Sequence, residues 1–266
     1  MAPSSGRVTV PRFTAMKAAG KKITMLTAYD YTMAALLDSA EIDGILVGDS
    51  VATVVQGQPT TLSVTMDQMV YHAEMVSRAA QHALVVADLP FLSYQASAAQ
   101  AIRNAGRFLK QTRCQAVKLE GGAEQAGTIA AVVAAGIPVM GHIGLRPQSV
   151  HQLGGYSVQR DRQRLLADAK AVEHAGAFAL VLECIPAPIA TEITATVGIP
   201  TIGIGAGPGC DGQILVIHDL LQLTPGRLPR HAKAYADLKT LIVGAVAQFR
   251  DEVRTGVFPG PQQVFE

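Results

Sequence analysis

Residues 44–50 read Gly-Ile-Leu-Val-Gly-Asp-Ser, a short apolar run that ends in an acid and a hydroxyl. Such a run, bounded by glycine, is typical of a buried parallel strand, because helices cover both faces of a parallel sheet. Similar runs recur along the chain at residues 23–30, 83–89, 116–121, 138–144, 178–185, 200–206 and 214–219. Eight runs match the number of strands in a closed (β/α)8 TIM barrel, which is the α/β fold that we predict.

Helical patterns separate most of these runs. Thr65 and Gln68 form a capping-box pattern at the start of one helix, and Gly176 is placed to stop another. Ser97 with Gln100 repeats the capping pattern. The link between the last two runs is too short for a full helix, so the seventh unit is predicted to be degenerate. Helices are predicted at residues 65–81, 101–110, 161–175 and 233–254.

The length of 266 residues fits one large domain better than two small ones. We expect a single barrel domain over residues 1–266, with a short N-terminal extension and a C-terminal closing helix and tail. An open doubly wound sheet is the competing architecture, but it has fewer strands and a glycine fingerprint after the first. Here residues 31–34 read Tyr-Thr-Met-Ala, without glycine, and the barrel is favoured.

Composition excludes several classes of partner. The chain has 22 basic and 21 acidic residues, mixed along its length, so nucleic acid is not an expected partner. Residues 1–7 lack the apolar core of a signal peptide. The most apolar stretch, residues 129–140, is broken by Gly136 and Pro138 and is shorter than the roughly 20 residues needed to span a bilayer.

Three cysteines without a CxxC pair suit a reducing compartment. We therefore expect a cytoplasmic protein without membrane contact.

Side chains capable of chemistry stand where the predicted strands end. In a TIM barrel these ends form one face, which carries the active site. Lys118 and Glu120 lie two apart within one strand, so both project to the same side. In chain order the strand ends carry Asp30, Asp49 with Ser50, Asp88, Lys118 with Glu120, His142 and Glu183.

Each of these residues, taken alone, has a purely structural explanation. Asp30 has the position of a helix cap. Lys118 is explained as a buried ion-pair partner of Glu120, and His142 as a hydrogen-bonded core histidine. The group as a whole is harder to explain in this way, because several acids gathered at one small barrel mouth repel one another.

A divalent cation among the acids removes that repulsion. Asp49, Asp88 and Glu120 offer hard oxygen ligands, and no Cys or paired-His spacing lies nearby, which favours Mg²⁺ over Zn²⁺. The glycine-rich residues 203–209 follow the seventh run, where barrels often bind phosphate. A phosphorylated substrate is therefore an alternative, although small residues also permit a tight connection.

Several motifs together resemble one known family. Residues 43–50 and 60–66 are similar to ketopantoate hydroxymethyltransferases, as are residues 87–91, 117–122, 141–145, 182–184 and 202–207. The resemblance runs in order and at family spacing from about Thr9 to the C-terminus. It implies a barrel of the phosphoenolpyruvate/pyruvate type.

The resemblance also implies a role for each strand-end residue. Asp49, Asp88 and Glu120 would hold one Mg²⁺ per subunit. Asp49, Ser50, Asp88 and Lys118 would contact a 2-keto acid, His142 would line the pocket, and Glu183 would be the catalytic proton acceptor.

The implied reaction adds a hydroxymethyl group from 5,10-methylenetetrahydrofolate, the cosubstrate, to 3-methyl-2-oxobutanoate. It gives 2-dehydropantoate in pantothenate biosynthesis, through an enolate that Mg²⁺ stabilises. Family members are cytoplasmic homodecamers, so the same assembly is expected here. One alternative is a Mg²⁺-dependent C–C lyase or mutase of the phosphoenolpyruvate/isocitrate-lyase type, but the Lys-Cys-Gly-His loop of those lyases is missing. A non-catalytic metabolite-binding barrel is a remoter alternative, because the acids, the lysine and the base are all present.

Overall fold

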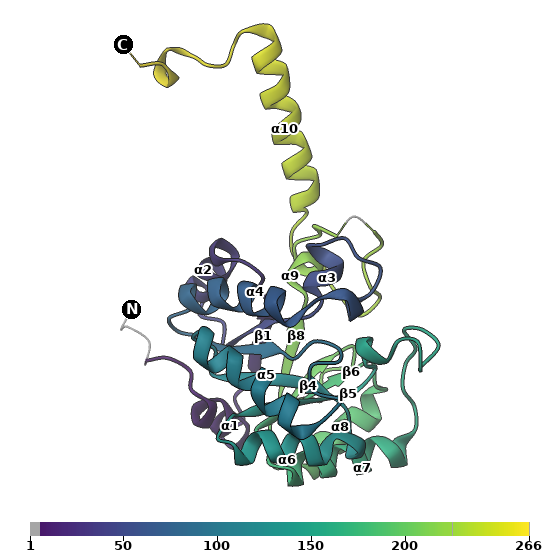
Figure 1. The fold of residues 1–266 in the computed structure, drawn as a ribbon. Helices are drawn as coiled ribbons and strands as arrows, with labels where there is room; N and C mark the ends of the chain where they lie inside the picture. The colour runs from purple at the N-terminus through teal and green to yellow at the C-terminus, as the bar shows by residue number, and fades with distance from the viewer. Residues whose placement is uncertain (1–5, 225, 266) are drawn as a thin grey trace. The chain divides into compact units, whose positions relative to one another are not determined.

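The computed structural model describes residues 6–224 and 226–265. Eight parallel strands form a closed barrel, each paired with the next in sequence, and β8 returns to pair with β1 (Figure 1). The predicted barrel is therefore confirmed. The strands are β1 (Ile23–Thr27), β2 (Gly44–Val47), β3 (Leu84–Asp88), β4 (Ala116–Glu120), β5 (Val139–Gly144), β6 (Ala179–Glu183), β7 (Thr201–Ile204) and β8 (Gly212–Leu215).

The eighth strand differs from its prediction at residues 214–219. It begins at Gly212, which pairs with Ile23 of β1 and Ile202 of β7, and it ends at Leu215. The residues that follow turn into the short helix α9 (Ile217–Leu220). A short apolar run has no periodicity that separates a strand from the start of a helix, which explains the error.

Helices surround the barrel in the order expected of a (β/α)8 fold (Figure 1). Residues 205–211 between β7 and β8 form turns and bends, so the degenerate seventh unit is confirmed. The barrel helices are α1 (Val10–Ala18), α2 (Tyr31–Ser39), α3 (Val51–Val54), α4 (Met66–Ala79), α5 (Ala98–Gln111), α6 (Ala126–Ala134), α7 (Arg162–His174) and α8 (Ala187–Thr196). The 3-10 turns among them are η1 (Thr61–Ser63), η2 (Ala123–Gln125) and η3 (Pro147–Ser149).

The predicted helix ends are formed by local hydrogen bonds. Thr65 and Gln68 make the full reciprocal capping box of α4. Ser97 caps α5 by accepting from the Gln100 N–H, but the Gln100 side chain donates to Leu92 O, so only half of that box is present. Each cap satisfies backbone N–H groups that have no partner inside the helix.

Side chains inside the barrel alternate along each strand and divide it into two layers. The lower layer is apolar and includes Met25 of β1, Val86 of β3 and Met140 of β5. Helix α1 contributes Phe13, which packs edge-on against Phe178 at a ring-centroid distance of 5.8 Å. Two residues further along the strands the interior becomes polar, because strand side chains repeat with period two. The functional groups therefore lie at the carboxyl ends of the strands, above an apolar layer.

The chain divides into two compact units, one ending at Val216 and the other beginning at Ile217. The second unit contains α9, α10 (Leu238–Thr255) and η4 (Pro261–Gln263). Helix α10 begins five residues after the predicted start, where Asp237 accepts a hydrogen bond from the Thr240 N–H. That both units form one domain stays a prediction.

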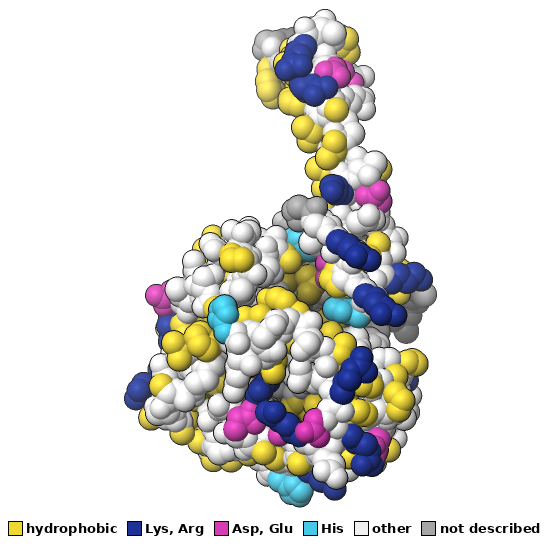
Figure 2. All heavy atoms as spheres, turned by 90° about the vertical axis from the view of Figure 1, so that its right-hand side faces the viewer, with side chains coloured by type: hydrophobic (Ala, Val, Ile, Leu, Met, Phe, Trp, Pro, Cys, Tyr) yellow, Lys and Arg dark blue, Asp and Glu magenta, His cyan; other side chains and the backbone are white. Residues whose placement is uncertain are grey.

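The surface carries charged side chains of both signs (Figure 2). Figure 2 shows Lys and Arg side chains scattered among acidic, hydrophobic and neutral ones on the face that it draws. Within residues 6–224 and 226–265, no helix has the length and apolar character needed to cross a bilayer.

Candidate active site

The strand ends bring a buried cluster of charged groups to one end of the barrel. Residue pairing places Asp88 beside Lys118 in adjacent strands, and Glu120 beside His142. Asp49 follows β2 and joins them through its N–H, which donates to Asp88 Oδ2 at 3.1 Å. All five of these side chains are buried, at 5% exposure or less.

Lys118 is the cation that neutralises the middle of this cluster. Its Nζ lies 2.8 Å from Asp88 Oδ1, and both side chains are almost fully buried. Burial alone would lower the pKa of Lys118, but the carboxylates of Asp88, Glu120 and Asp49 raise it above its ordinary value. The ammonium group therefore stays charged. The partner of Lys118 is Asp88 rather than Glu120.

His142 connects the lysine to Glu183, the predicted base. Lys118 Nζ lies 3.2 Å from His142 Nδ1, so the ammonium donates and Nδ1 accepts. Burial, followed by the Lys118 charge, lowers the pKa of His142 well below its ordinary value. The imidazole is thus neutral with its proton on Nε2, which faces Glu183 Oε2 at 3.1 Å. The contact with Lys118 fixes this tautomer, and the Nε2–H lies beside the Glu183 carboxylate without an aligned hydrogen bond to it.

Glu183 is the most accessible of the clustered carboxylates. Its side chain is 16% exposed, against 3% for Glu120. Cys184, directly after it, has a left-handed φ of 49°, a backbone conformation that non-glycine residues rarely adopt and that is often found at functional sites. Burial, followed by Glu183, raises the pKa of the Cys184 thiol to about 11, so the thiol is protonated at neutral pH.

Asp30 and Ser50 each lie at the start of a helix. Asp30 is the N-cap of α2, where it accepts from the Met33 N–H at 2.8 Å, so its structural explanation is confirmed. Ser50 lies at the start of α3, and its hydroxyl is 2.8 Å from the hydroxyl of the buried Tyr29.

Gln148 is a residue of the cluster that sequence reasoning missed. Its backbone N–H donates to Glu120 Oε2 at 3.0 Å, and its side-chain amide donates to Asp49 Oδ2 at 2.9 Å. The amide oxygen accepts from the Tyr94 hydroxyl at 2.8 Å. Gln148 therefore holds two of the acids in position from the loop after β5. A glutamine in a loop is usually exposed, and nothing in its sequence context signals this burial.

The chemistry of the acids fits a hard divalent cation. Burial, followed by the neighbouring Asp88, raises the pKa of Asp49 to about 7. Burial and then Asp49 raise the pKa of Glu120 well above its ordinary value. Carboxylates this close hold protons unless a cation compensates their charge, and all the donors are oxygen.

The acidic side chains of the site contact neighbouring protein groups through hydrogen bonds and an ion pair. In the described residues no three His, Cys, Asp or Glu side chains are placed to hold a metal ion. Asp49 and Asp88 instead contact Gln148 and Lys118. Metal binding by the predicted trio therefore requires these contacts to change, and the assignment of Asp49, Asp88 and Glu120 stays a proposal.

The raised pKa of Asp49 predicts a pH dependence of stability in metal-free protein. The unfolded carboxyl loses its proton near its ordinary pKa of 3.8, whereas the folded one keeps it until about pH 7. The folded state thus binds more protons in this window, and its stability falls as pH rises. Asp49→Asn removes this penalty. We expect the variant to gain stability relative to the parent as pH rises from 5 to 8, measured by urea unfolding with chelator present.

The matched control is Asp67→Asn, which removes a carboxylate that is 85% exposed. A stability difference between Asp49→Asn and the parent that is constant across the pH range, as large at pH 5 as at pH 8, would show that Asp49 titrates normally.

Sequence comparison identifies the family. Residues 7–261 match the profile described as ketopantoate hydroxymethyltransferase. A 3-methyl-2-oxobutanoate hydroxymethyltransferase of Desulforapulum autotrophicum is 56% identical over 260 residues, covering 98% of this chain and 99% of that protein. The chain belongs to the ketopantoate hydroxymethyltransferase family. A 3-methyl-2-oxobutanoate hydroxymethyltransferase of Rhodopirellula baltica is 55% identical, covering 98% of this chain and 97% of that protein.

Membership makes the chain an enzyme, a transferase of the hydroxymethyltransferase class. Solved structures support the fold. A phosphonopyruvate hydrolase in complex with oxalate and Mg²⁺ superposes with a TM-score of 0.65 at 15% identity, covering 97% of this chain and 92% of that one. A 2,3-dimethylmalate lyase of the PEP mutase/isocitrate lyase superfamily superposes with a TM-score of 0.61 at 19% identity, with the same coverage. At these identities the likeness shows the shared barrel alone.

Proposed function

We propose that this enzyme transfers a hydroxymethyl group from 5,10-methylenetetrahydrofolate to 3-methyl-2-oxobutanoate and forms 2-dehydropantoate. The names of the relatives support 3-methyl-2-oxobutanoate as the acceptor and hydroxymethyl as the transferred group. The observation that carries the proposal is the placement of Glu183 beside a neutral His142 that also contacts Lys118. One mouth thus combines a base with a cation for the substrate carboxylate.

The acceptor, 3-methyl-2-oxobutanoate, binds first, and it binds to the charged cluster. The Lys118 ammonium neutralises the carboxylate of the keto acid, and the Ser50 hydroxyl donates a hydrogen bond to that carboxylate. Asp49, Asp88 and Glu120 would hold Mg²⁺, which when bound supplies Lewis-acid polarisation of the keto group. His142, being neutral, adds no positive charge that would compete with Lys118 for the carboxylate.

Glu183 then removes the proton from the branched carbon. The proton passes to a carboxylate oxygen of Glu183, and the electron pair moves into the keto group as an enolate. The Nε2–H of His142, 3.1 Å from Glu183 Oε2, stabilises the negative charge of that carboxylate until the proton arrives. Water adds to the methylene carbon of the donor and both carbon–nitrogen bonds of that carbon break, which gives formaldehyde and tetrahydrofolate, with the two protons of water on the two nitrogens. The branched carbon then attacks the formaldehyde carbon, and the proton held by Glu183 passes to the new alkoxide oxygen, so the product is 2-dehydropantoate.

One assay tests the proposal. We expect the enzyme with Mg²⁺ to convert 3-methyl-2-oxobutanoate and methylenetetrahydrofolate to 2-dehydropantoate, detected by mass spectrometry. Omission of the donor stops product formation, and excess chelator reduces it by at least about a hundredfold because no Lewis acid then assists the enolate. Cleavage of a keto acid or a phosphonate without folate would instead support a lyase or mutase. A homodecameric assembly and a cytoplasmic location stay predictions from the family resemblance.

A further inference from the structure

A cavity opens beside the charged cluster. Its volume is about 400 Å³, and Glu120 and Gln148 form part of its wall. The rest of the wall comes from η1, from η2, and from the loops after β3 and β5. A cavity of this size accommodates a small-molecule ligand of several rings.

The wall of this cavity combines aromatic and amide side chains. Phe91 is 37% exposed, and the buried Tyr94 lines the cavity from the same loop. Amide groups are contributed by Gln95, Gln125 and Gln152. An aromatic face binds a flat heterocycle by stacking, and amides supply both donors and acceptors to its edge. These two features together suit a pterin, which is flat and has an amide-and-amidine edge.

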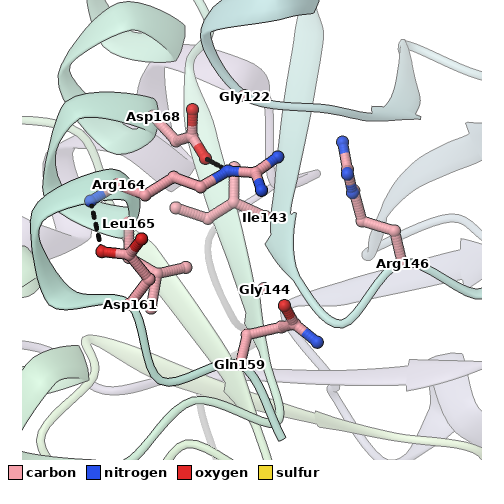
Figure 3. Close-up of a pocket in the computed structure, with 9 residues that line it drawn as sticks. All are labelled: Gly122, Ile143, Gly144, Arg146, Gln159, Asp161, Arg164, Leu165 and Asp168. Carbon is pink, nitrogen blue, oxygen red and sulfur yellow. Dashed lines mark hydrogen bonds and ion pairs between the residues drawn. The ribbon is translucent and has the colours of Figure 1, made fainter. Parts of the chain in front are cut away.

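Arg146 lines the cavity together with the acids Glu120 and Glu124. Arg146 also lines a smaller neighbouring pocket. Figure 3 shows Arg146 and Arg164 on opposite sides of that pocket, with Gln159 below them in the view. Arg146 is paired with Glu124, and Arg164 lies 3.7 Å from Asp168. Each guanidinium is thus paired with one protein carboxylate, and its five N–H donors leave further ones whose fork geometry matches a ligand carboxylate.

The cavity also lies close to the reacting centre. Glu120 Oε1 is 3.6 Å from His142 Nδ1, and Glu183 Oε2 is 3.1 Å from Nε2 of the same ring. The cavity wall and the base are therefore separated by a single imidazole. A donor bound in the cavity places its one-carbon unit next to the carbon that Glu183 deprotonates.

We propose that this cavity is the donor subsite, with the pterin of methylenetetrahydrofolate stacked on Phe91 and its glutamate carboxylates directed to Arg146 and Arg164. The inference rests on the proposed function, which names the donor but not its position. In this arrangement the ring lies beside Phe91 and the tail extends toward the neighbouring pocket, which Arg146 and Arg164 both line.

Phe91→Ala tests the ring end of this site. We expect the KM for the donor and the Kd for tetrahydrofolate, measured by calorimetry on the whole enzyme, to rise about tenfold or more, because a stacking partner is lost. The KM for the keto acid should rise less than the KM for the donor. Phe91→Tyr keeps the ring and should restore donor binding. The control is Leu36→Ala on α2, which removes an apolar side chain that is 58% exposed.

Arg164→Gln tests the anionic end with two donors. The KM should rise several-fold for methylenetetrahydrofolate, and should be equal to that of the parent for the methylene derivative of tetrahydropteroate, which lacks the glutamate. Arg103→Gln, an exposed arginine of α5, is the matched control. Circular dichroism of each variant checks that it is folded.

The outcomes separate the subsite from the function. Product formation by every variant, with donor KM and tetrahydrofolate Kd in Phe91→Ala and Arg164→Gln equal to those of the controls, overturns the subsite and leaves the function intact. A parent enzyme that forms no 2-dehydropantoate from any folate donor overturns the proposed function. In that case, tetrahydrofolate binding lost in Phe91→Ala and restored in Phe91→Tyr still supports the cavity as a folate site.

Discussion

Glu183→Gln is expected to abolish deuterium exchange at the branched carbon of 3-methyl-2-oxobutanoate, with a loss of about 10²–10⁴-fold. The exchange needs no folate and therefore reports the first chemical step alone. Glutamine has the shape of glutamate and can still accept a hydrogen bond from His142, but it cannot take up the proton. Binding of the keto acid and Mg²⁺, measured by calorimetry, should persist.

The matched control is Glu74→Gln on α4, where a partly exposed carboxylate is paired with Arg78. Its exchange rate should equal that of the parent. Normal exchange in Glu183→Gln, measured by proton NMR in deuterated buffer, would remove Glu183 as the base.

Glu120→Gln is expected to lower Mg²⁺-dependent turnover by about 10²–10³-fold without loss of stability. The charge of Glu120 is useful only when a cation is bound, because in metal-free protein its pKa is raised by burial and by Asp49. The neutral amide removes the like-charge repulsion and can still accept the Gln148 N–H. Activity and stability should therefore move independently, which a structural role for Glu120 does not predict.

Three measurements test this expectation: turnover across a Mg²⁺ titration, the Mg²⁺ Kd by calorimetry, and urea unfolding in chelator. Asp67→Asn serves as the surface control, since its carboxylate is 85% exposed. An unchanged Mg²⁺ Kd in Glu120→Gln, together with full turnover, would exclude Glu120 as a ligand.

The sequence predicts the barrel and the strand-end residues well because both follow from short-range patterns. Each strand is an apolar run, and its last inward side chain is the one that reaches the mouth, so Asp88, Glu120 and His142 are found by counting. The pairing of Lys118 with Asp88 is different. It depends on the register between β3 and β4, which no single strand encodes.

The rest of the site depends on loops. Gln148 reaches Asp49 and Glu120 only because η3 folds the loop after β5 back over the barrel mouth. Tyr94 contacts Gln148 from the loop after β3. Neither loop has a periodicity from which its path can be predicted, and both side chains are found in the interior only once the fold is known.

The pairing of β1 with β8 has a consequence for synthesis on the ribosome. The outer edge of β1 receives its backbone partners from residues 212–215, which emerge after all the other strands. Until then a growing chain carries an open, apolar sheet with a row of unpaired N–H and C=O groups. Such an edge binds other unfinished chains. Pairing of β1 with β8 is slow because the two strands are far apart in the sequence. Translation of this enzyme should therefore depend on chaperones most strongly just before the last strand appears.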